Sequence, residues 1–190
     1  MKKILMVLGV IAAVMGFSME ASAKKMMVIN LDKGEMPSNI FGCDASLSEE
    51  HATTKGGLSL KVVVTAEGAK TANWYAGEWS NVKRAIWDGY ECLKFDVFNP
   101  TKEMLPLSVL IVQGTLKLDS PLVARPGAST LELQLPGLCD NKGNAFDFKT
   151  KLKAWNINQY GAGVKEKTTL FISNIRLETE EDEAPAKGKK

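Results

Sequence analysis

Aromatic side chains crowd one short polar stretch of the sequence, where they could hold a flat ligand that carries hydroxyl groups. Residues 73–79 contain Trp74, Tyr75 and Trp79 together with an amide, a glycine and a carboxylate. Such rings offer a large apolar area and keep a polar edge wet, which suits stacking against the C–H face of a sugar. We therefore expect this connection to present at least one ring to a carbohydrate. The alternative is that Trp74 or Trp79 plugs one end of the fold.

Other polar side chains could contact the hydroxyl groups of the same ligand. Asn156 and Asn158 alternate with Trp155 and should lie on the opposite, outward face of a strand. Tyr160 follows them in an expected loop. Asp96 shares a strand face with Lys94 and is a further candidate, although the two could equally form ion pairs with each other or with neighbouring strands.

Catalytic signatures are sparse. A nucleophilic triad would have to use His51, which is the only histidine and has no nucleophile motif beside it. Glycoside hydrolysis needs two carboxylates across a cleft. The carboxylates close in sequence form no distinctive pair: Glu78, Asp88, Glu91 and Asp96. We expect binding without catalysis, and a small glycan-active hydrolase is the less favoured alternative.

The first 23 residues have the layout of a cleaved signal peptide. A basic start is followed by an apolar run over 4–17 and by the small-residue site Ala21-Ser22-Ala23. The run is short for a bilayer span, and no later segment is apolar enough. We expect a bacterial secreted or periplasmic protein with one domain over 24–178 and a disordered charged tail over 179–190. The formal net charge of +2 gives no support for nucleic-acid binding.

Three cysteines would reach an oxidising compartment, so one disulfide and one free thiol are the simplest expectation. Cys43 and Cys139 both lie near glycines in expected loops, whereas Cys92 lies within a strand. This favours a Cys43–Cys139 bond, although sequence leaves the connectivity open.

Short β-rich segments separated by glycine and proline turns predict an all-β, antiparallel β-sandwich or barrel. The last segment favours a sandwich with bent strands, because Leu170 and Ile172 have the opposite parity to Ile175 and Leu177. A bulge near Ser173-Asn174 would return all four to the core. The expected strands are 26–31, 45–51, 58–66, 91–99, 105–113, 115–118, 122–125, 129–135, 152–158 and 168–177.

Four segments in succession, 48–62, 87–100, 125–133 and 169–177, resemble galactose-binding-like jelly rolls. This is the fold of many carbohydrate-binding modules attached to bacterial glycoside hydrolases. The resemblance implies a poly- or oligosaccharide ligand and, as a possible partner, a separate glycoside hydrolase or a cell-envelope component. A β-sandwich resembling the complex I intermediate-associated protein shares much of the pattern. A structural or assembly module without sugar binding is therefore the main alternative.

The same resemblance raises the question of a structural calcium ion, since such modules often carry one. An acidic ligand commonly lies in the strand that corresponds to 169–177, where this chain has Ser173, a poor ligand for a hard cation. Asp32 and Glu35 are the only weak candidates that remain. We expect no cofactor and regard calcium as the less favoured reading.

Overall fold

Two antiparallel β-sheets make up the protein in the computed structural model, which describes residues 24–179. The predicted all-β antiparallel sandwich is confirmed, with only a short helix α1 (Ala66–Thr71) and a 3-10 turn η1 (Leu31–Lys33) besides the strands. The strands are β1 (Lys25–Met27), β2 (Asn39–Phe41), β3 (Cys43–Ser48), β4 (Ser59–Val64), β5 (Asn73–Trp79), β6 (Cys92–Asn99), β7 (Leu105–Gln113), β8 (Leu116–Ala124), β9 (Gly127–Gln134), β10 (Ala154–Tyr160) and β11 (Thr169–Glu178).

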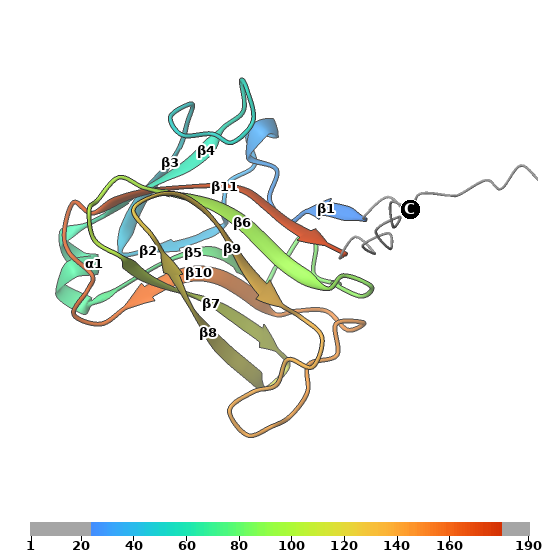
Figure 1. Cartoon of the computed structure of the whole chain (residues 1–190). Coiled ribbons are helices and arrows are strands. Elements are labelled where there is room, and N and C mark those ends of the chain that lie inside the picture. Colours follow the sequence, from blue (N-terminus) through green and yellow to red (C-terminus); the bar gives the residue numbers. More distant parts are fainter. Residues whose placement is uncertain (1–23, 180–190) are drawn as a thin grey trace, which may run out of the picture. The chain divides into compact units, whose positions relative to one another are not determined.

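The two sheets lie in separate layers (Figure 1). The six-stranded sheet has the order β3-β4-β11-β6-β9, and β1 pairs with the end of β11. The five-stranded sheet has the order β2-β5-β10-β7-β8. Alternate side chains of each strand fill the space between the layers, as Leu93, Phe95 and Val97 of β6 do. The other half of the side chains therefore forms two outer faces, and any binding face has to be sought there or at the loops.

Strand β11 contains the predicted bulge. Its register against β6 shifts between Ser173 and Arg176, and Asn174 has φ of 51°, a left-handed conformation that asparagine tolerates better than most residues. The bulge brings the two halves of the strand into the same interior, where four apolar residues are buried: Leu170, Ile172, Ile175 and Leu177.

Short elements such as β2 and α1 were not expected, and two longer segments also differ from the sequence-based expectation. Residues 73–79, expected as a connection, form strand β5, which pairs with β10 along its whole length. Residues 115–118 and 122–125 merge into the single strand β8. Pro121 is tolerated within it because β8 ends the sheet order, where a missing N–H breaks no ladder on the free side.

The predicted signal peptide and residues 180–190 of the predicted tail lie outside the described residues. Thr179 is described, and its hydroxyl accepts a hydrogen bond from the Lys24 N–H at 2.8 Å. Over residues 24–179, helices are too short or too polar to cross a membrane.

Candidate functional site

Strand β5 sends its side chains alternately into the sandwich and onto the outer face of the five-stranded sheet. Trp74 and Trp79 are five positions apart, so they point to opposite sides. Trp74 is fully buried, and its indole N–H donates to Gln159 Oε1 at 2.9 Å. Trp79 is 43% exposed. Trp74 is therefore withdrawn from the predicted ligand contacts, because a ring without exposed surface cannot stack on a ligand.

Strand β10 adds its outward side chains to the same face. Asn158 lies opposite Tyr75 of β5, and Tyr160, which extends the strand rather than starting a loop, is 44% exposed. Trp155 and Ile157 face the core, as the alternation predicts. The outer face thus brings together five of the seven predicted contact residues: Tyr75, Trp79, Asn156, Asn158 and Tyr160.

A hollow of about 370 Å³ lies on this face, and we call it the outer groove. It combines exposed rings with amide groups and a single ammonium group, the mixture that suits a sugar with apolar C–H faces and polar rims. Its lining residues are Asn39, Tyr75, Trp79, Leu110, Lys117, Asn156 and Tyr160.

A chain of hydrogen bonds fixes the amides beside the outer groove. Ser108 of β7 bonds to Asn158 Oδ1, and Asn158 Nδ2 donates to Asn156 Oδ1 at 3.0 Å. A weaker contact of 3.4 Å joins Asn158 Nδ2 to Asp119. Asn156 and Asn158 are almost fully buried. Asn158 has no exposed surface and is withdrawn from the predicted ligand contacts, as Trp74 is, whereas Asn156 lines the outer groove. Because Asn158 fixes the Asn156 amide, that amide loses little entropy on binding.

Gly77 allows β5 and β10 to approach closely beneath this surface. A Cβ atom at Gly77 would lie 2.2 Å from the Trp155 carbonyl oxygen and 2.4 Å from Asn156 Cα. A larger residue would push Asn156 out of place.

The Tyr160 phenol is kept neutral at the rim of the outer groove. Burial raises its pKa above the ordinary value, and the negative charge of Asp119 adds to this effect. Tyr160 can therefore donate or accept a hydrogen bond over the whole physiological pH range.

Asp96 does not belong to this site, because it lies on the outer face of the six-stranded sheet. Thr130 and Asn174 donate to its carboxylate at 2.8 and 3.0 Å, and Arg176 pairs with it at 3.5 Å. Burial by itself would raise the pKa of Asp96, but these partners outweigh it and hold the pKa below the ordinary value. The carboxylate is thus already satisfied by the protein.

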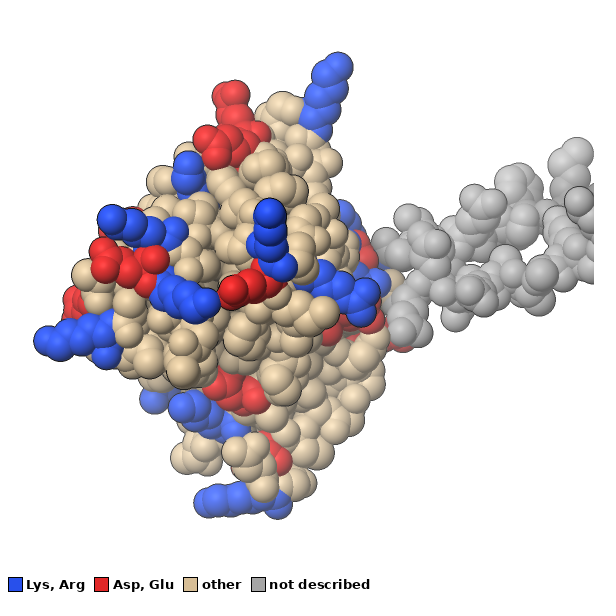
Figure 2. Space-filling model, turned by 60° about the vertical axis from the view of Figure 1, so that its left-hand side comes forward, with Lys and Arg blue, Asp and Glu red and all other residues tan. Residues whose placement is uncertain are grey.

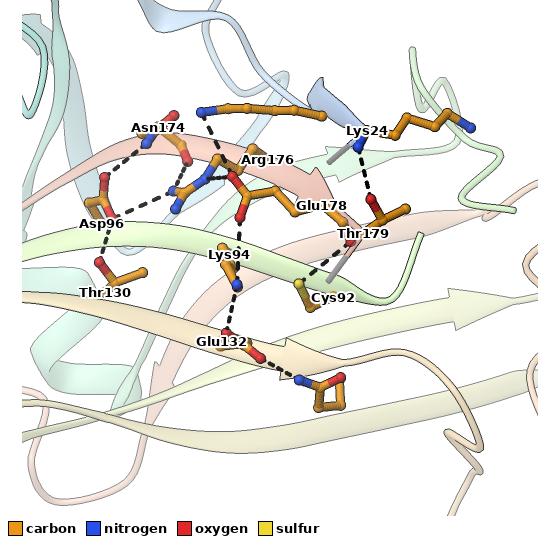
Figure 3. Close-up of polar contacts among 12 residues, drawn as sticks. Lys24, Cys92, Lys94, Asp96, Thr130, Glu132, Asn174, Arg176, Glu178 and Thr179 are labelled. Atoms are coloured by element: carbon orange, nitrogen blue, oxygen red, sulfur yellow. Dashed lines mark hydrogen bonds and ion pairs between the residues drawn. The ribbon is translucent and has the colours of Figure 1, made fainter. Parts of the chain in front are cut away.

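Charged neighbours of Asp96 continue this network across β9, β6 and β11 (Figure 3). Lys94 pairs with Glu132 at 3.1 Å and with Glu178 at 3.5 Å, and Arg176 pairs with Glu178 at 2.6 Å. The alternative considered for Lys94 and Asp96, ion pairing with neighbouring strands, is what the structure has. Figure 2 likewise shows acidic and basic side chains interspersed on the face that it displays.

A second and larger hollow, of about 580 Å³, lies on the six-stranded sheet beside this network. His51 closes one side of it, with its ring parallel to that of Phe98 at a centroid distance of 3.5 Å. The Phe98 ring in this hollow is therefore already stacked against His51 and is less available to a ligand. No hydrogen bond joins His51 to a nucleophile of the described chain, so it has no triad geometry. We favour the smaller outer groove because its rings are open to solvent.

The two weak calcium candidates are engaged by the protein. Glu35 pairs with Arg84 at 2.9 Å, and hydrogen bonds from Arg84 and from the Asn30 N–H lower its pKa to about 2. Asp32 accepts hydrogen bonds from the Leu58 N–H at 2.7 Å and from Thr54 at 3.3 Å. Residues 24–179 contain no group of three or more acidic, histidine or cysteine side chains placed to hold a metal ion.

All three cysteines are free, so the favoured Cys43–Cys139 disulfide is wrong. Cys43 lies on β3 and Cys139 follows β9, and these two strands end opposite edges of the six-stranded sheet. Such a separation exceeds the Cα distance of about 7 Å that a disulfide can span. Burial raises the pKa of the Cys43 thiol to about 12, with a further contribution from the charge of Asp44, so this thiol is unreactive.

Sequence reasoning missed three residues of the outer groove: Asn39, Leu110 and Lys117. Leu110 and Lys117 lie within predicted strands on the outward parity, but only the pairing of β10 with β7 and of β7 with β8 places them beside Asn156. Asn39 belongs to β2, a strand too short to be recognised.

Comparison with known proteins identifies the fold. No family model and no curated protein matches the sequence. An exo-β-agarase structure matches with a TM-score of 0.64 at 13% identity, over 83% of this chain and 25% of the agarase. A second agarase, AgWH50C, matches with a TM-score of 0.61 at 12% identity, over 82% of this chain and 24% of that one.

The structure of a single module matches over nearly its whole length. It is the family 11 carbohydrate-binding module of a cellulosomal cellulase of Clostridium thermocellum, with a TM-score of 0.56 at 11% identity, over 83% of this chain and 95% of the module. The chain therefore spans about a quarter of each agarase but nearly all of the module. At these identities the likeness concerns the fold, and it confirms the predicted jelly-roll sandwich of carbohydrate-binding modules.

Proposed function

We propose that the protein binds a poly- or oligosaccharide in the outer groove and does not transform it. The observation that carries this proposal is the exposure of Trp79 and Tyr160 beside the buried, hydrogen-bonded amides of Asn156 and Asn158. The rings would stack on sugar faces, and the Asn156 amide, held in place by the fully buried Asn158, would meet a hydroxyl group. The shared fold of a carbohydrate-binding module supports the same reading.

The absence of catalysis is part of the proposal. The carboxylates near the outer groove offer no acid and base facing each other across it, since Asp119 contacts Asn158 and the inward Glu78 accepts a hydrogen bond from the Lys83 N–H. The agarase activity named for two structural neighbours belongs to chains of which this chain spans about a quarter, and it is not assigned here.

We further propose that the protein works outside the cytoplasm, after removal of residues 1–23, as a secreted or periplasmic binder. A separate glycoside hydrolase or a cell-envelope component would be its partner. Binding would need no metal ion, because the lining of the outer groove contains no carboxylate. Adding EDTA should leave both glycan affinity and melting temperature unchanged, whereas a drop in melting temperature that calcium reverses would establish a structural ion.

The test is a binding assay on a panel of soluble and insoluble glycans with two matched variants. Trp79→Ala removes an exposed ring from the outer groove and should weaken binding at least about tenfold. His51→Ala removes the ring at the other hollow and should change affinity by less than about twofold. Failure to retain the wild type on any glycan, or equal binding by Trp79→Ala, would contradict the proposal and favour a structural module.

A further inference from the structure

The outward side chains of the five-stranded sheet are buried along its middle and exposed along its sides. On β8, the last strand of the sheet, Lys117 and Asp119 are exposed. On β5, towards the other side, Trp79 is exposed and Tyr75 is half-buried. The middle strands β10 and β7 present buried residues outward: Ala154, Asn156, Asn158, Ser108, Leu110 and Val112. The outer groove is therefore a trough with β10 and β7 as its floor, and it runs in the direction of the strands.

Aromatic rings line only one side of this trough. In the described chain, the strands of this sheet contribute these outward rings: Phe41, Tyr75, Trp79 and Tyr160. Strands β7 and β8 contain no aromatic residue. Phe41 stacks on Tyr75 at a centroid distance of 5.5 Å and supports it from β2. A saccharide that stacks on more than one of these rings therefore follows β5 and β10.

The two exposed rings lie near opposite ends of β10. Trp79 pairs with Ala154, and Tyr160 is six positions further along the strand that contains Ala154. At about 3.3 Å per residue, the two rings are anchored about 20 Å apart in the strand direction. This separation exceeds the length of a disaccharide, so a short sugar can reach only one of the two rings at a time.

Two amides and a glycine occupy the middle of this span. Gly77 lies between Tyr75 and Trp79 on β5, and it pairs with Asn39 on one side and with Asn156 on the other. Because glycine has no side chain, the row of rings is interrupted there, and both amides line the groove beside the gap. An amide group can donate and accept hydrogen bonds, which matches the hydroxyl groups along a sugar chain.

We infer that the outer groove holds a saccharide chain lengthwise along β5 and β10, with its two ends at Trp79 and Tyr160. The Asn39 and Asn156 amides contact the middle of the chain. This inference rests on the proposed function and names the ligand as a chain longer than a disaccharide. Once one chain reaches both rings, the second contact costs no further translational freedom, so affinity should rise steeply with chain length. A chain that crossed the strands would leave the rings and meet the charged side chains of β8.

The first experiment compares chain lengths, using the di-, tetra- and hexasaccharides of one glycan that the wild type retains. The hexasaccharide should bind at least about tenfold more tightly than the disaccharide. In Tyr160→Ala this ratio should fall to about threefold or less, because the chain then meets an exposed ring at one end only. Val123→Ala removes an exposed apolar side chain of β8 and should leave the ratio unchanged.

The outcomes separate this inference from the proposed function. Equal affinities for the disaccharide and the hexasaccharide, or an unchanged ratio in Tyr160→Ala, would overturn the lengthwise chain while leaving glycan binding intact. Binding of no saccharide of any length would overturn the proposed function as well.

A second experiment measures the direction of the chain. A hexasaccharide that carries a nitroxide at its reducing end broadens the NMR signals of nearby amides. Lengthwise binding predicts the strongest broadening at one end of β5 and β10, around Trp79 or around Tyr160. Strongest broadening along β2 or β8 would mean that the chain crosses the strands, and it would overturn the inference while glycan binding itself remained.

Discussion

The outer faces of the two sheets differ in how far the protein's own side chains engage their charged and aromatic groups. On the six-stranded sheet, Asp96, Arg176 and Glu178 compensate one another, and His51 covers the ring of Phe98. On the five-stranded sheet, the rings of Trp79 and Tyr160 stay open to solvent. The comparison teaches that a hollow alone does not define a site. A ligand gains binding free energy from groups that the protein itself does not already contact, and the exposed rings of the five-stranded sheet are such groups.

The two tryptophans of β5 should separate stability from binding more sharply than any other pair. Trp74→Ala removes a fully buried ring and leaves Gln159 Oε1 without its donor, so we expect a loss of about 3–5 kcal/mol in the free energy of unfolding. Trp79→Ala should cost less than about 1 kcal/mol. Urea unfolding measures both. Comparable losses in the two variants would mean that Trp79 also belongs to the core.

A substitution on the six-stranded face should destabilise the protein without touching glycan affinity. Arg176→Met removes the guanidinium that pairs with Asp96 and Glu178, in a region where the Arg176 side chain is 11% exposed. Glu178 keeps its pair with Lys94, so the loss should be about 1–3 kcal/mol. The control is Lys61→Met, which breaks a solvent-exposed pair with Glu50 and should cost less than about 1 kcal/mol. Weaker glycan binding by a folded Arg176→Met variant would contradict the assignment of binding to the five-stranded sheet alone.

The Glu35–Arg84 pair should make part of the stability depend on pH. Because the pKa of Glu35 falls from 4.5 to about 2 on folding, its contribution is complete above pH 4.5 and disappears as the pH falls towards 2. Glu35→Gln should cost about 1–2 kcal/mol at pH 7, after allowance for solvent screening, and less at pH 3. Unfolding curves at both pH values test this, and a pH-independent difference would exclude the ion pair as its cause.

The smallest effect concerns the orientation of the groove amides. Ser108→Ala removes the bond that fixes Asn158, which in turn fixes Asn156, so glycan affinity should fall about threefold. Ser46→Ala changes an exposed serine on the other sheet and should leave affinity unchanged. Calorimetric titration resolves a threefold change, and equal affinities would show that the amides need no such support.

Strand alternation carried much of the fold prediction, and its failures have physical causes. The parity change in 168–177 located the β11 bulge, since only a bulge could bury both halves. The polar, glycine-containing composition of residues 73–79 predicts a connection, since Gly77 is a poor strand former. Gly77 is needed there for close approach to β10, a requirement that only the paired strand reveals. Recognising a strand would have placed Trp74 and Trp79 on opposite faces.

Most of the outer groove was within reach of sequence reasoning, and part of it was not. Tyr75, Trp79 and the β10 residues have the right chemistry and outward parity. Lys117 was invisible because its place beside Asn156 depends on two strand pairings. Asp96 was misplaced for the same reason, as its strand belongs to the other sheet. Parity assigns a side chain to an outer face, and sheet order decides which face that is.

Amide chemical-shift mapping during titration with a bound oligosaccharide tests the central claim most directly. The account predicts the largest changes at Tyr75, the Trp79 indole N–H and the side-chain amide of Asn156, with little change at 51–53 and 128–130. Changes centred on 51–53 and 128–130, with the Trp79 and Asn156 signals unmoved, would place the ligand in the hollow beside His51 and contradict the account.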